Sequence, residues 1–140
     1  MQPALDHWGN IMMTISAKGI VMQDDRLWLR KNERADWELP GGRVNDDEQP
    51  EETVVREIRE ELGVACSDVS LLDLYVWKKD FGTNLHIGIA TYVCHQRETI
   101  ADFEHIGEAG TAQFQQFTID EALALANLPE VYKRALRRLL

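Results

Sequence analysis

Residues 50–63, PEETVVREIREELG, constrain the fold of this chain more than any other segment. Pro50 suits the first position of a helix, the acidic residues after it suit the positive end of the helix dipole, and Gly63 suits a helix-ending position. At about 100° per residue, one face of such a helix is apolar. That face carries Val54, Val55, Ile58 and Leu62. The segment therefore predicts an amphipathic helix over residues 50–62 that has to pack on another layer.

Strands are predicted before and after this helix, and further helices at the end of the chain. Residues 11–30 predict a β-hairpin that turns at Asp24 and Asp25. Residues 43–49 predict a polar loop. Later strands are predicted at residues 70–78, 85–95 and 112–117. A capping-box pattern at Thr118 opens one helix, and another is expected at about residues 128–139. This order predicts an α/β fold with a mixed sheet and helices on its faces.

Length and composition favour one folded, acidic domain. The chain has 140 residues, enough to bury a core, and 44% of them are hydrophobic. A net charge of −9 lacks the electrostatic footprint of a protein that binds duplex nucleic acid. No segment resembles a membrane span or a secretion signal. Cys66 and Cys94 have no metal-ligand spacing, so buried, reduced thiols and a cytoplasmic location are expected.

Three carboxylates cluster near the end of the predicted helix. Glu57, Glu60 and Glu61 share an arc of about 100° beside the apolar face, which places them at the rim of the domain. Clustered carboxylates raise one another's pKa unless a positive charge lies among them. Mg²⁺ takes oxygen ligands of this kind and would supply that charge. The alternative is a solvated helix on which Arg56 and Arg59 pair with the glutamates.

The residues upstream make this pattern specific. Residues 42–64 read GRVNDDEQPEETVVREIREELGV, which resembles the Nudix box, the signature of the Nudix (MutT-type) hydrolases. Every defined position of the box is matched, and WELPGGR at residues 37–43 resembles the usual approach to it. Asp47 departs from the glycine that many members have there. The resemblance implies the Nudix fold, an α/β/α sandwich with a mixed central sheet, as a single domain over residues 1–140.

The resemblance also implies a loop–helix–loop that holds Mg²⁺, or Mn²⁺, against a diphosphate. Glu57 and Glu61 would be the principal metal ligands, and Glu60 a ligand or the base. The backbone carbonyl of Gly41 would be a further ligand. Arg56 would pair with Glu48 or with a box glutamate and orient it. The catalytic group implied is therefore Glu60, Glu57, Arg56 and Glu48.

Other residues are candidates for the substrate or for the base. Arg30 and Arg43 flank the box loop and are candidates to bind phosphates. Glu104 and Glu108 lie in a downstream loop, where the family's base or an extra ligand sometimes lies, although solvated loop acids are an equal alternative. Five aromatic residues could stack on a nucleobase, although strand aromatics more often belong to the core. These are Trp28, Trp37, Tyr75, Trp77 and Phe81.

The activity that the resemblance implies is hydrolysis of a nucleoside diphosphate linked to another group. The products would be a nucleoside monophosphate and a phosphorylated remainder. The downstream markers of several subfamilies are absent, which favours a nucleoside triphosphate or a nucleotide sugar as substrate. One alternative is a non-catalytic Nudix-fold module that binds or senses a nucleotide. Another is an acidic α/β interaction domain with a coincidental motif. A homodimer is expected from the resemblance alone.

Overall fold

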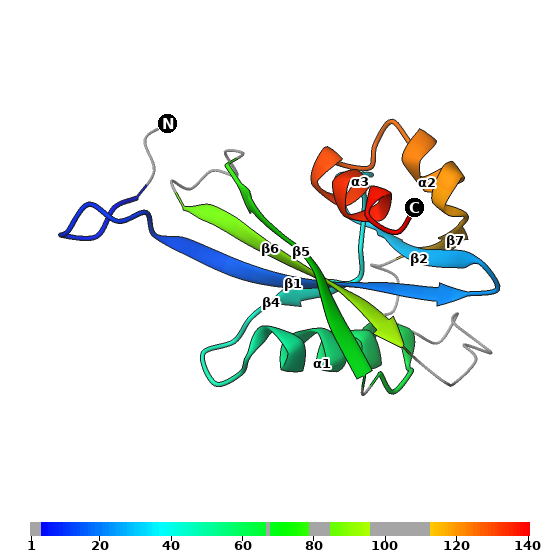
Figure 1. The fold of residues 1–140 in the computed structure, drawn as a ribbon, viewed down its shortest axis with the longest axis horizontal. Coiled ribbons are helices and arrows are strands. Elements are labelled where there is room, and N and C mark those ends of the chain that lie inside the picture. The colour runs from blue at the N-terminus through cyan, green and yellow to red at the C-terminus, as the bar shows by residue number, and fades with distance from the viewer. Residues whose placement is uncertain (1–3, 67, 79–84, 96–112) are drawn as a thin grey trace.

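The computed structural model describes residues 4–66, 68–78, 85–95 and 113–140, and these form a mixed sheet between helices (Figure 1). In chain order, the elements are β1 (Met13–Gln23), β2 (Arg26–Lys31), β3 (Trp37–Glu38), β4 (Gly41–Arg43), α1 (Pro50–Leu62), β5 (Asp68–Trp77), β6 (His86–His95), β7 (Gln113–Phe117), α2 (Ile119–Ala124) and α3 (Glu130–Arg137). The strand order is β3-β2-β1-β6-β5, with β4 paired to β1 and β7 paired to β2. The expected α/β class and mixed sheet are confirmed.

The first hairpin turns where the sequence predicts it. Asp24 and Asp25 both have positive φ, at 53° and 62°, as the tight turns that suit twisted strands require. The loop predicted over residues 43–49 was wrong at its first residue, because Arg43 belongs to strand β4 (Gly41–Arg43), a strand that the sequence analysis did not predict. This short strand has little propensity of its own and forms through antiparallel pairing with β1, where Lys18 lies opposite Gly41.

The centre of the sheet is a long parallel pair. β1 and β6 pair from Met13 opposite His86 to Val21 opposite Cys94. β5 completes that side as an antiparallel neighbour of β6. This pairing makes the sheet mixed and brings the start of the chain beside its middle.

Helices cover both faces of the sheet. In Figure 1, α1 lies below the sheet and α2 and α3 lie above it. The core under α1 includes its residues Val54, Ile58 and Leu62, as the apolar pattern predicts. Val55 is only half-buried, whereas Thr53 is fully buried. The core on the other face is built around Ile20, Leu29 and residues of α2 and α3.

Two further sequence-based expectations concern the cysteines and the membrane. Cys66 and Cys94 are both free and buried. In the part of the chain that the structure describes, none of the helices combines the length and the apolar character that a membrane crossing needs.

Candidate active site

Helix α1 has clear start and stop signals. Pro50 occupies the first turn, and Gln49 and Glu52 form a reciprocal capping box that the sequence analysis did not identify. Gly63 ends the helix with φ of 69°, in the left-handed region that favours glycine. These boundaries match the prediction and fix which residues of α1 face the sheet.

Arg56 joins the loop before α1 to the helix itself. Its Nε and Nη2 donate to the two carboxylate oxygens of Glu48 at 3.1 and 2.8 Å, a bidentate pair. Glu48 also accepts from the Thr53 hydroxyl at 2.7 Å and from the Asn45 backbone N–H at 3.1 Å. The hydrogen bonds from Arg56, and then from Thr53, lower the pKa of Glu48 to about 2. Glu48 is therefore a fixed anion that holds the guanidinium in place.

The same guanidinium reaches two glutamates of α1. Arg56 Nη1 donates to Glu57 at 3.1 Å and to Glu60 at 3.3 Å. The Glu57 side chain is 18% exposed and that of Glu60 is 59% exposed. Glu57 therefore faces inward, whereas Glu60 lies at the outer edge and is open to water.

Glu57 and Glu61 meet the glycines of β4. Glu61 Oε2 accepts a hydrogen bond of 2.9 Å from the Gly41 backbone N–H. Glu57 lies so close to Gly42 that a Cβ there would be 2.4 Å from Glu57 Oε1. The sequence order Gly41-Gly42 thus lets two carboxylates approach the backbone of one strand.

Glu61 is largely buried and lies near the negative charge of Glu57. Burial raises its pKa to about 7, with the negative charge of Glu57 adding to the increase and Lys18 opposing it. A divalent cation between the two carboxylates would relieve both effects, so this donor pair fits such an ion. Within the described ranges, no group of three or more His, Cys, Asp or Glu side chains is placed to hold a metal. Glu57 and Glu61 are thus the inward-facing carboxylates of this group, and Glu60 is the more exposed one.

The two predicted phosphate-binding arginines differ in their surroundings. Arg30 Nη1 donates to Glu38 at 2.7 Å, and both side chains are largely buried, at 24% and 18% exposed. Arg43 is exposed and lines a cavity next to β4. Glu104 and Glu108 lie outside the described residues.

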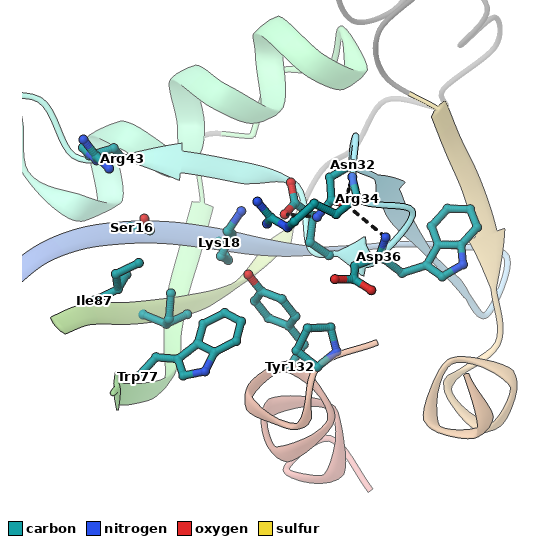
Figure 2. A pocket seen from close by; sticks show the side chains of 13 residues that line it. Ser16, Lys18, Asn32, Arg34, Asp36, Arg43, Trp77, Ile87 and Tyr132 are labelled. Atoms are coloured by element: carbon teal, nitrogen blue, oxygen red, sulfur yellow. Dashed lines mark hydrogen bonds between the residues drawn. The ribbon is translucent and has the colours of Figure 1, made fainter. Parts of the chain in front are cut away.

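The cavity lies on the α3 side of the sheet and has a volume of about 250 Å³. Figure 2 shows cations on one side of it, including Lys18, Arg34 and Arg43, and rings on the other. The lining residues are Ser16, Lys18, Asn32, Arg34, Asp36, Trp37, Glu38, Arg43, Trp77, Ile87, Ile89, Pro129 and Tyr132. A cavity that has apolar walls and a few convergent polar groups is typical of a small-molecule site.

Of the five aromatic candidates, Trp37 and Trp77 line this cavity. Trp28 is buried in the core under α1, and Tyr75 packs against the opposite core. Phe81 lies outside the described residues. The sequence analysis did not identify Lys18 or Tyr132, which also line the cavity. A lysine inside the apolar run IMMTISAKGIVM was the signal that could have identified Lys18.

Together, the fold and the site define an α/β/α sandwich with a carboxylate-bearing helix packed on β4 and a ligand-sized cavity on the α3 side of the sheet, where Arg43 of β4 lines the cavity. The model of the NUDIX domain family matches residues 10–139, so the chain belongs to the NUDIX family. The resemblance that the box indicated is thus confirmed.

Solved structures of the family share this fold. The MutT NUDIX hydrolase from Burkholderia pseudomallei is 25% identical with a TM-score of 0.73, over 92% of this chain and 99% of that chain. The MutT protein from Methanosarcina mazei Go1 is 18% identical with a TM-score of 0.75, over 91% of this chain and 92% of that one.

A curated relative matches over a shorter stretch. The RNA pyrophosphohydrolase of Pseudomonas aeruginosa (strain UCBPP-PA14) is 39% identical over 57 residues, which are 39% of this chain. The match spans 36% of the length of that relative. The names of these proteins agree with the expectation of a hydrolase that acts on phosphorus-containing anhydrides.

Proposed function

We propose that this protein is a divalent-metal-dependent pyrophosphohydrolase. It cleaves a diphosphate linkage in a nucleoside diphosphate derivative and releases a nucleoside monophosphate and a phosphorylated product. The observation that carries the proposal is the approach of Glu57 and Glu61 to Gly41-Gly42, next to a cavity that is lined by cations and rings.

In this proposal Glu57 and Glu61 hold Mg²⁺ or Mn²⁺, together with the Gly41 carbonyl. The bound ion would neutralise phosphate charge and lower the pKa of a water molecule. The Arg56 guanidinium keeps Glu57 oriented, because it contacts that carboxylate while Glu48 holds it from behind. Arg43, which lines the cavity, would bind a phosphate.

We assign proton transfer to Glu60. Its carboxylate is the most water-exposed of those that contact Arg56, so it can accept a proton from an attacking water and pass it to solvent. Glu104 and Glu108 remain candidates for this role or for a further metal ligand. Arg30 supports the cavity by holding Glu38, and it reaches the phosphates only if that pair opens.

The substrate class favoured by the sequence is a nucleoside triphosphate or a nucleotide sugar. The name of the Pseudomonas relative, an RNA pyrophosphohydrolase, adds RNA as a candidate substrate. A panel of these substrates with Mg²⁺ and with Mn²⁺, read by released phosphate and monophosphate, tests the proposal. Glu60→Gln and Glu61→Gln should each reduce turnover at least about a hundredfold, because one loses the base and the other a ligand. Asp46→Asn, in the exposed part of the preceding loop, is the matched control.

Turnover of none of these substrates, or glutamate variants as active as the wild type, would overturn the proposal. Nucleotide binding by calorimetry without turnover would favour the alternative, a non-catalytic module.

A further inference from the structure

Lys18 is a buried cation that the chemistry proposed above does not use. It lies in the middle of β1 and is only 7% exposed. Alternate residues of β1 face the same side of the sheet, so Lys18 points to the α3 side, as do Ser16 and Ile20. Ser16 and Lys18 both line the cavity, and Figure 2 shows the Lys18 side chain directed into it.

The ammonium group of Lys18 has no hydrogen bond or ion pair with any described residue. The nearest anions are already engaged. Glu38 accepts from Arg30 at 2.7 Å through one oxygen and from Asn32 at 3.3 Å through the other. Glu61 accepts from the Gly41 N–H. Glu38 and Glu61 therefore interact with Lys18 electrostatically, without a hydrogen bond or an ion pair.

A lysine side chain carries a positive charge at neutral pH. A buried ammonium has three N–H donors and no acceptor, and leaving such donors unpaired is costly. Because no described residue accepts from this ammonium group, an acceptor atom of a ligand, or water, can accept from it inside the cavity.

The wall around Lys18 suits a flat ring. The Tyr132 ring centroid lies 5.9 Å from Lys18 Nζ. Tyr132 and Trp77 meet edge to face, with centroids 6.0 Å apart and planes at 82°. Ile87 and Ile89 extend the same surface. A planar ring can lie against these side chains with one polar edge toward Lys18. Arg43 lines the part of the cavity that is formed by the Nudix box.

We propose that Lys18 is a specificity-determining residue that donates a hydrogen bond to an exocyclic oxygen of the nucleobase. Uracil, thymine and guanine carry an oxygen at the 4- or 6-position, where cytosine and adenine carry an amino group. The amino group is a hydrogen-bond donor, and so is the ammonium group of Lys18, so the two groups cannot form a hydrogen bond with each other. The pocket therefore selects the bases that carry an oxygen at this position. This inference depends on the proposed function only for the ligand being a nucleotide.

The test uses two pairs of nucleoside monophosphates that differ at this position: uridine against cytidine monophosphate, and inosine against adenosine monophosphate. Their dissociation constants are measured by calorimetry on the full-length protein, without added metal, so no hydrolysis is required. The wild type should bind the oxo member of each pair at least about tenfold more tightly, because a hydrogen bond to a charged group has this magnitude.

Lys18→Met keeps most of the side-chain volume and removes the donors, so both ratios should fall to about one. Lys18→Arg retains donors and should keep part of the preference. Lys133→Met, on the outer side of α3, is the matched lysine control and should keep both ratios. Thermal melting establishes that each variant is folded.

Three results would overturn the inference. One is equal binding of both members of each pair by the wild type, and another is an unchanged preference in Lys18→Met. The third is a uniform loss of affinity for all four ligands in Lys18→Met, which would assign Lys18 to the phosphate. A base preference without turnover supports the role of Lys18 and rejects the hydrolase proposal. Turnover without a base preference rejects the role of Lys18 alone.

Discussion

The carboxylate of Glu61 accepts a hydrogen bond of 2.9 Å from the backbone N–H of Gly41, which joins α1 to β4. The two residues are twenty positions apart in the sequence, and the contact places a titratable group against the backbone of the sheet. The glycines of β4 and the glutamates of α1 therefore act as one unit, and changes in either should affect the other.

The two adjacent glycines should respond differently to the same substitution. Gly41 has φ of 144°, and a Cβ there would lie 2.1 Å from the Ala17 carbonyl oxygen, so Gly41→Ala should unfold or strongly destabilise the protein. At Gly42 the added Cβ would meet the flexible end of Glu57. Gly42→Ala should therefore fold with a melting temperature near that of the wild type but lose at least about tenfold in activity or metal affinity. Equal melting temperatures for the two variants would contradict this.

Glu61 should make the metal-free protein less stable as the pH rises. Between about pH 4.5 and 7 the folded protein keeps a proton on Glu61 that the unfolded chain has released, because the pKa is raised to about 7. Its contribution to the free energy of unfolding is thus fully present below pH 4.5 and lost above about 7. In a chelator, Glu61→Gln should raise the melting temperature by a few degrees at pH 8 and hardly at all at pH 4.5. A difference of equal size at both pH values would exclude this cause.

Glu48 should show the opposite pH dependence. Its pKa is lowered to about 2, so the stability it contributes is present above its ordinary value of 4.5 and is lost as the pH falls toward 2. Glu48→Gln should lower the melting temperature at pH 7 and reduce activity about tenfold or more, because Arg56 loses its bidentate partner. Asp46→Asn makes the same change in charge in the same loop and should do neither. If the two variants behaved alike, the Arg56 pair would not be the reason.

Asp73 should anchor the helix that carries Tyr132. Its side chain is 4% exposed and lies 3.1 Å from Arg134 and 3.3 Å from Arg138. Asp73→Asn keeps the shape and removes the charge, and should reduce the free energy of unfolding by about 1–3 kcal/mol in urea denaturation. Asp68→Asn, an exposed acid on the same strand, is the control. A smaller loss for Asp73→Asn than for the control would show that the pair contributes nothing.

Much of the fold could be predicted because local signals agreed with the final structure. Helix α1 has its proline, its terminating glycine and its apolar face within fourteen residues, and the observed bounds equal the predicted ones. The hairpin turn at Asp24 and Asp25 was similarly local. The parallel pairing of β1 with β6 could not be predicted, because it joins distant segments and leaves no mark on either one.

Some residues of the candidate site could likewise be predicted from the sequence, and others could not. The positions of Glu48, Arg56 and Glu57 follow from spacing along one loop and one helix. Strand β4 could not be foreseen, since a Gly-Gly-Arg sequence becomes a strand only through its neighbour β1. Glu61 accepts from the Gly41 backbone N–H, whereas Glu60 accepts from Arg56, and this difference arises from tertiary packing that the sequence does not show. Lys18 and Tyr132 come from opposite ends of the chain, so nothing in either segment indicates the other.

The parallel pairing of β1 and β6 also governs how the molecule is assembled. Met13 and His86 are paired although they are 73 positions apart, and the whole of α1 lies in the intervening segment. Closing a loop of that length costs entropy before any contact offsets it, so this step should be slow compared with helix formation. In a chain made from its N-terminus, α1 and its carboxylates are therefore complete before β6, the strand that closes the centre of the sheet beside β1.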